Sequence, residues 1–311
     1  RMSDAGRFMF FMQAEVIAIA TDLAEVIGGA IALNLLFGLP LFIGGLVIGA
    51  ISTVMLWFQG GKTQTTFERI IIVMLLIITF GFIAGLFVAP PNPGEVVKGM
   101  IPRFQGADSV LMAASILGAT VMPHAIYLHS TLVNDHYAGG EKPSIKTQLR
   151  GSKIDVAWAL LLAGTVNLAM LVLAANSLHG IRDRIGTIFS IGLLASSLSS
   201  TSVGTYAGSE IMHGLLHVNA PMWACRVVTL VPALIVLWFA KDPTQALVIG
   251  QVVLSIGIPF AVIPLMRYTH DKELMGKWAD GTVKHVIFMI VVALIVALNV
   301  LLIVLTLMGR A

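Results

Sequence analysis

Apolar runs of about 20 residues recur along the whole chain, and each is long enough to cross a lipid bilayer. Lipid offers the backbone no hydrogen-bond partners, and the runs lack the strict alternation of barrel strands. The sequence therefore predicts an all-α integral membrane protein with about nine transmembrane helices, in which residues 1–311 form one transmembrane domain. The predicted spans cover residues 8–33, 39–58, 69–89, 109–130, 154–176, 187–205, 223–240, 244–265 and 285–308.

Composition and charge agree with a membrane location. Hydrophobic residues make up 57% of the chain and charged residues 11%, whereas soluble domains carry about 25% charged residues. About two thirds of the 19 lysines and arginines fall in one alternating set of loops, which places the N-terminal end and the loops 131–153 and 266–284 in the cytoplasm. We expect a multi-pass protein of the cell membrane, of bacterial plasma-membrane type, in contact with lipid. The net charge of +3 argues against a nucleic-acid partner, and no obligate protein partner is evident.

The segment GATVMPHAIYLHS, residues 118–130, interrupts the fourth predicted span. Pro123 has no amide hydrogen, so the carbonyl of Ala119 loses its helical donor, and Met122 places a thioether beside the break. Secondary transporters bind ions at such broken helices. A carbonyl with a thioether suits Mn²⁺, Fe²⁺, Co²⁺ or Cd²⁺ better than Ca²⁺ or Mg²⁺. The alternative is a proline kink in which Met122 only fills a packing gap.

Two histidines follow the break. His124 and His129 are five positions apart and point about 140° away from each other on a regular helix. This spacing disfavours a histidine pair on one metal ion and makes His124, next to the break, the better candidate for a proton acceptor. Alternatively, each imidazole is simply hydrogen-bonded to a nearby backbone carbonyl.

The first predicted span holds three carboxylates in QAEVIAIATDLAEVIGG, residues 13–29. Glu15, Asp22 and Glu25 lie within about 80° of one another on a helix, and intramembrane acids usually face a bundle interior or water and mark ion or proton pathways. Arg226, near the start of the seventh span, is the cation expected to pair with them. Alternatively, Glu15 reaches the membrane interface while Asp22 and Glu25 only pair with a structural cation.

A third stretch, ASSLSSTSVGTYAGSE at residues 195–210, is rich in small and hydroxyl side chains. Such residues favour close helix packing and interhelical hydrogen bonds. Together, the strings ATVMPHAIYLHS, ATDLAE and LSSTSVGTYAGSEIM resemble the Nramp family of proton-coupled divalent metal transporters. The resemblance runs through the whole chain. It implies a LeuT-type fold of two inverted five-helix repeats, of which this chain corresponds to family helices 3 to 11.

The resemblance also implies a function. The chain is expected to be a secondary active transporter, not an enzyme, that imports Mn²⁺ and Fe²⁺, and also Cd²⁺ or Co²⁺, coupled to protons by alternating access. The metal is the transported substrate, and no cofactor is implied. By position, Met122 resembles the thioether ligand and Ala119 the carbonyl ligand, with Pro123 at the break. Gln251 resembles a residue that completes the site on closure, and Asn167 is a water-mediated candidate.

The same resemblance suggests a proton pathway. Asp22 and Glu25 resemble its acids, with His124 at the upper end, Arg226 as the paired cation and Glu15 further along. Two departures from the family stand out. The family's Asp-Pro-Gly-Asn motif is absent from these 311 residues, so we expect an N-terminally truncated chain that lacks the first two family helices. Cys225 precedes Arg226 where the family commonly has a second arginine.

Other classes remain as alternatives at this point. A different LeuT-fold symporter for other cations or amino acids would need a glycine-rich unwound site without a thioether. An intramembrane metal enzyme would need a nucleophile or a three-ligand metal set with an open position. A scaffold that transports nothing is the third alternative.

Overall fold

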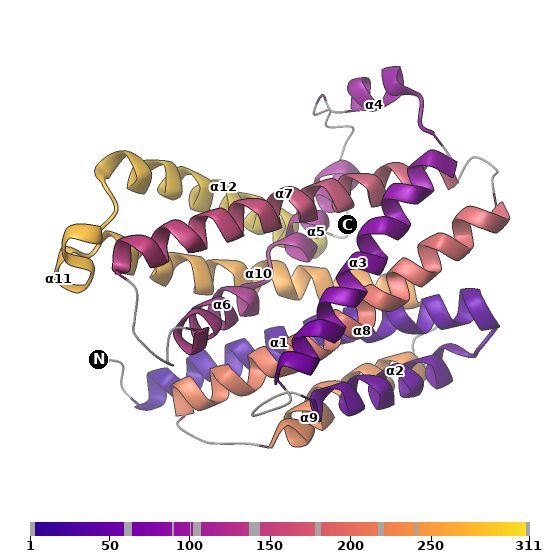
Figure 1. The fold of residues 1–311 in the computed structure, drawn as a ribbon, viewed down its shortest axis with the longest axis horizontal. Helices are drawn as coiled ribbons and strands as arrows, with labels where there is room; N and C mark the ends of the chain where they lie inside the picture. Colours follow the sequence, from indigo (N-terminus) through magenta and orange to yellow (C-terminus); the bar gives the residue numbers. More distant parts are fainter. Residues whose placement is uncertain are drawn as a thin grey trace.

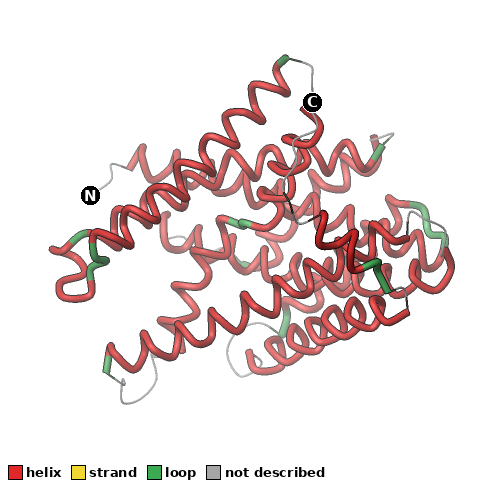
Figure 2. Tube along the Cα trace, turned by 90° about the horizontal axis from the view of Figure 1, so that it is seen from above, coloured by secondary structure: helices red, strands yellow, loops and turns green. Residues whose placement is uncertain are grey.

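The computed structural model describes residues 4–58, 64–88, 90–99, 101, 107–136, 144–177, 182–216, 221–239 and 242–308. Within these ranges all regular structure is helical (Figures 1 and 2). The helices are α1 (Asp4–Phe37), α2 (Leu41–Leu56), α3 (Gln64–Val88), α4 (Pro93–Gly99), α5 (Ala107–Thr120), α6 (Pro123–His136), α7 (Ile145–Ser177), α8 (Arg182–Leu216), α9 (Met222–Phe239), α10 (Pro243–His270), α11 (Lys272–Met275), the 3-10 turn Gly276–Trp278, and α12 (Thr282–Leu307).

Each predicted span corresponds to a helix or to a pair of half-helices. Among the described residues, seven helices can cross a membrane by length and composition, namely α1, α3, α7, α8, α9, α10 and α12. The apolar helix α2 has 16 residues, and the fourth predicted span is divided between α5 and α6, with 14 residues each. The chain is therefore a multi-pass membrane protein, as predicted.

Several helices are longer than expected. The sixth span was predicted at residues 187–205, whereas α8 continues to Leu216 through the hydroxyl-rich stretch. Its hydroxyls donate to carbonyls of their own helix, for example Thr205 to Thr201 at 3.0 Å and Ser202 to Leu198 at 2.9 Å. These bonds satisfy the polar side chains without a loop. Likewise α6 and α7 extend into residues 131–153, which were expected to form a loop.

Helix α1 occupies the centre of the fold and packs against α8, α2, α9 and α10, with α8 running beside it (Figure 1). The core between α1, α2 and α9 includes Val26, Ile48 and Ala233, which are fully buried. Close backbone approach makes this packing possible, because a Cβ at Gly44 would lie only 3.0 Å from the Cα of Ala30. The acidic residues of α1 are therefore held in the middle of the bundle.

A second cluster joins α3, α7 and α8. Phe82 and Leu173 are fully buried there, and the ring of Phe82 meets that of Phe189 edge-on at a centroid distance of 5.8 Å. The outer faces are apolar as well, with Phe87 on α3 83% exposed and Leu294 on α12 65% exposed. Large exposed apolar side chains on every side are expected where lipid replaces water.

Helices α10 and α12 pack against each other and against the broken segment. Ile258, Val262 and Val292 are buried between the two helices, and Val121 packs against this cluster. At one end of the pair, the rings of His270 and His285 stack at a centroid distance of 3.9 Å. These contacts fix α12 to α10 close to the break in the fourth span.

Candidate functional site: a helix break beside buried carboxylates

The break lies where the sequence predicts it. Helix α5 ends at Thr120 and α6 begins at Pro123, with Val121 and Met122 between them. The amide of Val121 still donates to the carbonyl of Leu117 at 3.0 Å, and the amide of Ala125 donates to Met122 at 3.2 Å. As the first residue of α6, Pro123 needs no amide hydrogen. The carbonyl of Ala119, four residues earlier, receives no bond from it.

Helix α10 touches the broken segment at a glycine. A Cβ on Gly118 would lie 2.8 Å from the backbone oxygen of Gln251 and 3.3 Å from the Cβ of Ser255. Only glycine allows the two backbones to come so close. The side-chain oxygen of Gln251 is buried and has no hydrogen-bond partner among the described residues. The residue whose backbone meets the broken segment thus also carries a buried side-chain oxygen without a partner in the described structure.

This contact gives a direct stability prediction. Because the carbonyl facing Gly118 belongs to the backbone and cannot rotate away, we expect Gly118→Ala to lower the free energy of unfolding by about 1–3 kcal/mol. The control is Gly81→Ala in α3, since a Cβ at Gly81 meets nothing within 4 Å. That control is expected to be neutral or slightly stabilising. Thermal unfolding of both variants in detergent measures the difference, and equal midpoints would contradict the close approach.

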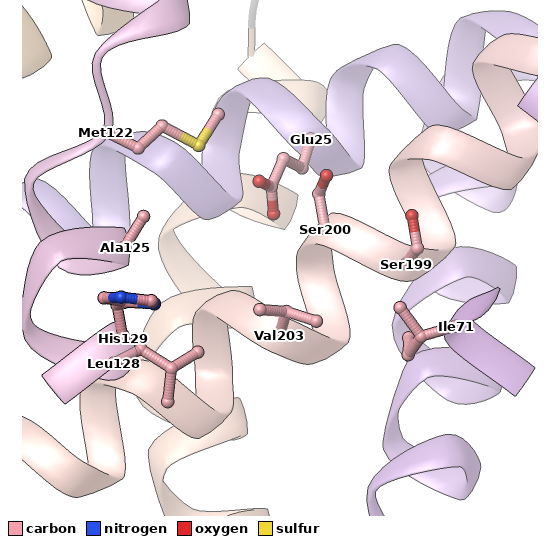
Figure 3. Close-up of a pocket in the computed structure, with 9 residues that line it drawn as sticks. All are labelled: Glu25, Ile71, Met122, Ala125, Leu128, His129, Ser199, Ser200 and Val203. Atoms are coloured by element: carbon pink, nitrogen blue, oxygen red, sulfur yellow. The ribbon is translucent and has the colours of Figure 1, made fainter. Parts of the chain in front are cut away.

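A cavity of about 330 Å³ opens on the other side of the break, between α1, α3, α6 and α8 (Figure 3). It has room for several water molecules. In Figure 3 the thioether of Met122 reaches toward the carboxylate of Glu25, and Ser200 lies next to that carboxylate. The cavity is lined by Glu25, Ile71, Met122, Ala125, Leu128, His129, Ser199, Ser200 and Val203. A soft sulfur and a carboxylate therefore line one cavity, which is open to the surface on the side of the exposed residues Ala125 and His129.

The carboxylate of Glu25 is shielded from solvent. Both of its oxygens are buried and have no hydrogen-bond partner in the described part of the chain. Its backbone carbonyl accepts a bond from Ser197 at 2.6 Å, which fixes α1 against α8. Gly204 of α8 lies beside the carboxylate, since a Cβ added there would be in ordinary contact with Oε2 at 3.7 Å. A buried acid without partners is costly, so its free oxygens are suited to a cation or a proton.

One turn earlier on α1, Asp22 forms the predicted ion pair with Arg226 of α9. Arg226 Nη1 donates to Asp22 Oδ2, and Arg226 is fully buried. The pair is incompletely satisfied, because Asp22 Oδ1 and Arg226 Nε and Nη2 have no partners among the described residues. Asp22, Arg226 and the hydroxyl of Thr201 are close enough to act electrostatically on Glu25. Asp22, Glu25 and Arg226 thus form one buried cluster of ionisable side chains.

The remaining predicted residues are distributed as follows. His129, which the spacing argument made secondary, lines the cavity, whereas the side chain of His124 lies outside the described part of the structure. Glu15 is half-buried on α1 and is not among the residues that line this cavity. Asn167 is exposed on α7, away from the lining.

Some polar residues near the cavity were not predicted individually from the sequence. Ser199 and Ser200 line the cavity, and the hydroxyl of fully buried Thr201 has no partner that meets hydrogen-bond geometry. Their stretch was noticed only as a packing surface, because a row of serines on a helix does not show which of them face a cavity. The sequence analysis also did not single out Asn299 of α12, a buried amide that is 4% exposed.

No group of three or more histidine, cysteine or acidic side chains in the described ranges is arranged to hold a metal ion. The sequence profile of the family described as Natural resistance-associated macrophage protein-like, Nramp, matches residues 1–305. The chain belongs to the Nramp family.

Relatives of this Nramp chain have been named in several bacteria. The chain is 46% identical over 327 residues to the divalent metal cation transporter MntH of Mycobacterium tuberculosis, covering 99% of this chain and 76% of the relative. It is 40% identical over 315 residues to MntH of Bacillus subtilis, covering 94% and 73% respectively. Both relatives are transporters and not enzymes, which agrees with the class predicted from the sequence.

A solved structure shows the Nramp fold directly. The manganese transporter of Eremococcus coleocola, in complex with an aromatic bis-isothiourea substituted compound, superposes with a TM-score of 0.81 at 26% identity. The match covers 96% of this chain and 71% of that one. The predicted LeuT-type transporter fold is confirmed.

Proposed function

We propose that this protein transports divalent transition-metal ions across the membrane. Mn²⁺ and Fe²⁺ are the proposed main substrates, with Cd²⁺ and Co²⁺ accepted as well, and import is coupled to protons by alternating access. The observation that carries the proposal is the shared cavity at the helix break, into which both Met122 and Glu25 project. The transporter names of the relatives support the same substrate class.

The proposed metal ligands lie on both sides of the break. Met122 supplies its thioether, and Ala119 supplies the backbone carbonyl that Pro123 leaves without a donor. Gln251, with its buried free oxygen, would complete the shell when α10 closes on the broken segment. Asn167 would contribute only through water. A sulfur ligand in this set favours Mn²⁺, Fe²⁺ and Cd²⁺ over Ca²⁺ and Mg²⁺.

The proposed proton pathway starts at Glu25 and continues through Asp22 and Arg226. Glu25 faces the cavity, and Asp22 is the next acid along α1. A metal ion entering beside Glu25 would favour release of a proton, because two positive charges in one buried cavity repel. His124 at the upper end and Glu15 further along α1 are the proposed continuations.

Uptake into proteoliposomes tests the proposal. Because the 311 residues span 76% of the length of the Mycobacterium tuberculosis relative, the assay uses the full-length protein. We expect Mn²⁺ uptake driven by an inward proton gradient, competition by Cd²⁺, and no uptake of labelled amino acids. Amino-acid uptake without Mn²⁺ uptake would overturn the proposal in favour of another LeuT-fold symporter.

Removing the carboxylate of Glu25 separates metal transport from proton transport. We expect Glu25→Gln to lower metal-driven proton flux about tenfold or more, since an added barrier of ~1.4 kcal/mol already gives a factor of ten. Metal binding should persist, because the thioether and carbonyl ligands remain. A pH-sensitive dye inside the liposomes measures proton flux alongside Mn²⁺ uptake. The control is Glu273→Gln, which removes an exposed carboxylate in α11; unchanged proton flux in Glu25→Gln would exclude Glu25 from the pathway.

A further inference from the structure

Helix α10 contains a backbone gap close to the proposed site. Pro259 lies inside this helix and has no amide hydrogen, so the carbonyl of Ser255, four residues earlier, loses its helical donor. Ser255 is only 1% exposed, so bulk water cannot supply the missing hydrogen bond. A buried carbonyl without a partner is strongly destabilising, and in a membrane it must be satisfied within the protein.

Asn299 of α12 fills this gap. Its Nδ2 donates to the carbonyl oxygen of Ser255 at 2.6 Å, and the hydroxyl of Ser255 donates to Asn299 Oδ1. The two bonds fix the orientation of the amide, because the reverse orientation would bring two acceptor oxygens together. Asn299 is 4% exposed in a helix that is otherwise almost entirely apolar, where a polar side chain needs a specific partner.

The bridge lies next to the metal site proposed above. Gln251 is four residues before Ser255 and therefore lies on the same face of α10, one turn away. Gly118 in the broken segment lies against both residues, since a Cβ added there would be 2.8 Å from the carbonyl oxygen of Gln251 and 3.3 Å from the Cβ of Ser255. Val121 at the break packs against the apolar cluster shared by α10 and α12. Helix α12 is thus connected to the broken segment by way of α10, in addition to its own contacts with α5.

We propose that Asn299 is a positioning residue for transport. By supplying the hydrogen bond that Pro259 removes, it fastens the bend of α10 to α12 and holds Gln251 against the broken helix. The role rests on the proposed metal transport. Asn299 itself does not touch the ion in this proposal, and it acts through the backbone of α10.

A double-mutant cycle tests the role in the full-length protein. Asn299→Leu keeps the size of the side chain but removes its amide, and Pro259→Ala restores a backbone amide four residues after Ser255. In the wild-type background, we expect Asn299→Leu to lower the thermal midpoint by about 3–6 °C, because a buried carbonyl is left unsatisfied. We expect the KM for Mn²⁺ to rise about fivefold, the effect of one lost hydrogen bond, with a smaller change in the maximal rate.

In the Pro259→Ala background the restored amide can serve Ser255, so both losses should fall to less than half. Equal losses in the two backgrounds would overturn the proposal, because the carbonyl would then not be what Asn299 serves. The proposal would also be overturned if Asn299→Leu lowered the thermal midpoint less in the Pro259→Ala background but left the KM for Mn²⁺ unchanged in both backgrounds. The bridge would then only stabilise the fold.

Ser255→Ala is the matched control, since it removes the hydroxyl but keeps the backbone carbonyl. We expect its KM for Mn²⁺ to stay within about twofold of the wild type because Asn299 still donates to the Ser255 carbonyl, whereas its thermal midpoint should fall because Asn299 Oδ1 loses its donor. If Ser255→Ala reproduced the full effect of Asn299→Leu, the hydroxyl and not the proline gap would be responsible, and the proposal would fail. Failure of the proposed function is recognised separately, because the wild-type protein itself would then take up no Mn²⁺.

Discussion

Replacing Met122 with alanine is expected to keep Mn²⁺ uptake but to weaken Cd²⁺ binding by about 10- to 100-fold, the range observed when even a residue that only orients a metal ligand is removed. Mn²⁺ tolerates all-oxygen coordination, whereas Cd²⁺ gains most from a sulfur ligand. For the same reason, Ca²⁺ and Mg²⁺ should begin to compete with Mn²⁺ in the variant. Uptake of Mn²⁺ in proteoliposomes, with each cation added as a competitor, measures all of these changes.

The matched control is Met112→Ala. Met112 lies on α5, in the same broken segment, but its side chain is 64% exposed and does not line the cavity. Its removal should leave the order of competing cations unchanged. If Met122→Ala and Met112→Ala gave the same cation profile as the wild type, sulfur coordination at the break would be wrong, although transport as such could still hold.

The break and the buried ion pair were predictable because each follows from one local rule. A proline in an apolar span must interrupt the helical bonding, and α5 accordingly ends at Thr120, three residues before Pro123, where α6 begins. A buried acid in a membrane must find a cation, and Arg226 was the available cation near the start of a span. Neither inference needed the arrangement of the helices.

The rest of the site depends on contacts between distant segments. Its place next to the break made His124 the preferred histidine, and this stays a prediction because its side chain lies outside the described structure. That His129 lines the cavity follows from the packing of α6 against α8 and could not be read from the sequence. The contact of Gly118 with α10 joins residues more than a hundred positions apart, and no periodicity encodes it. Asn299 stands out as a polar residue in an apolar span, yet only the packing of α12 against α10 identifies the Ser255 carbonyl as its partner.

Removing Arg226 should have the largest effect on stability. In Arg226→Leu, the carboxylates of Asp22 and Glu25 remain buried without a cation, and loss of one partner from a buried pair costs about 3–5 kcal/mol. Replacing both partners, in Asp22→Leu with Arg226→Leu, removes the uncompensated charge of Asp22 and leaves Glu25, which forms no ion pair with Arg226 in the described structure, as it is in the single variant. We therefore expect the double variant to regain most of the lost stability, because an apolar pair of similar volume is often as stable as a buried ion pair.

Thermal unfolding of the two single variants and the double variant in detergent gives the coupling between Asp22 and Arg226. The exposed pair Lys284–Asp280, at 3.8 Å, is the reference, and Lys284→Ala should change stability by no more than about 1 kcal/mol. Additive losses for Asp22 and Arg226 would show that the two side chains do not depend on each other. The stable double variant is also expected to have lost proton-coupled uptake, because Asp22 and Arg226 would then be absent from the pathway that begins at Glu25. The effects on stability and on proton coupling would thereby be measured separately at one buried ion pair.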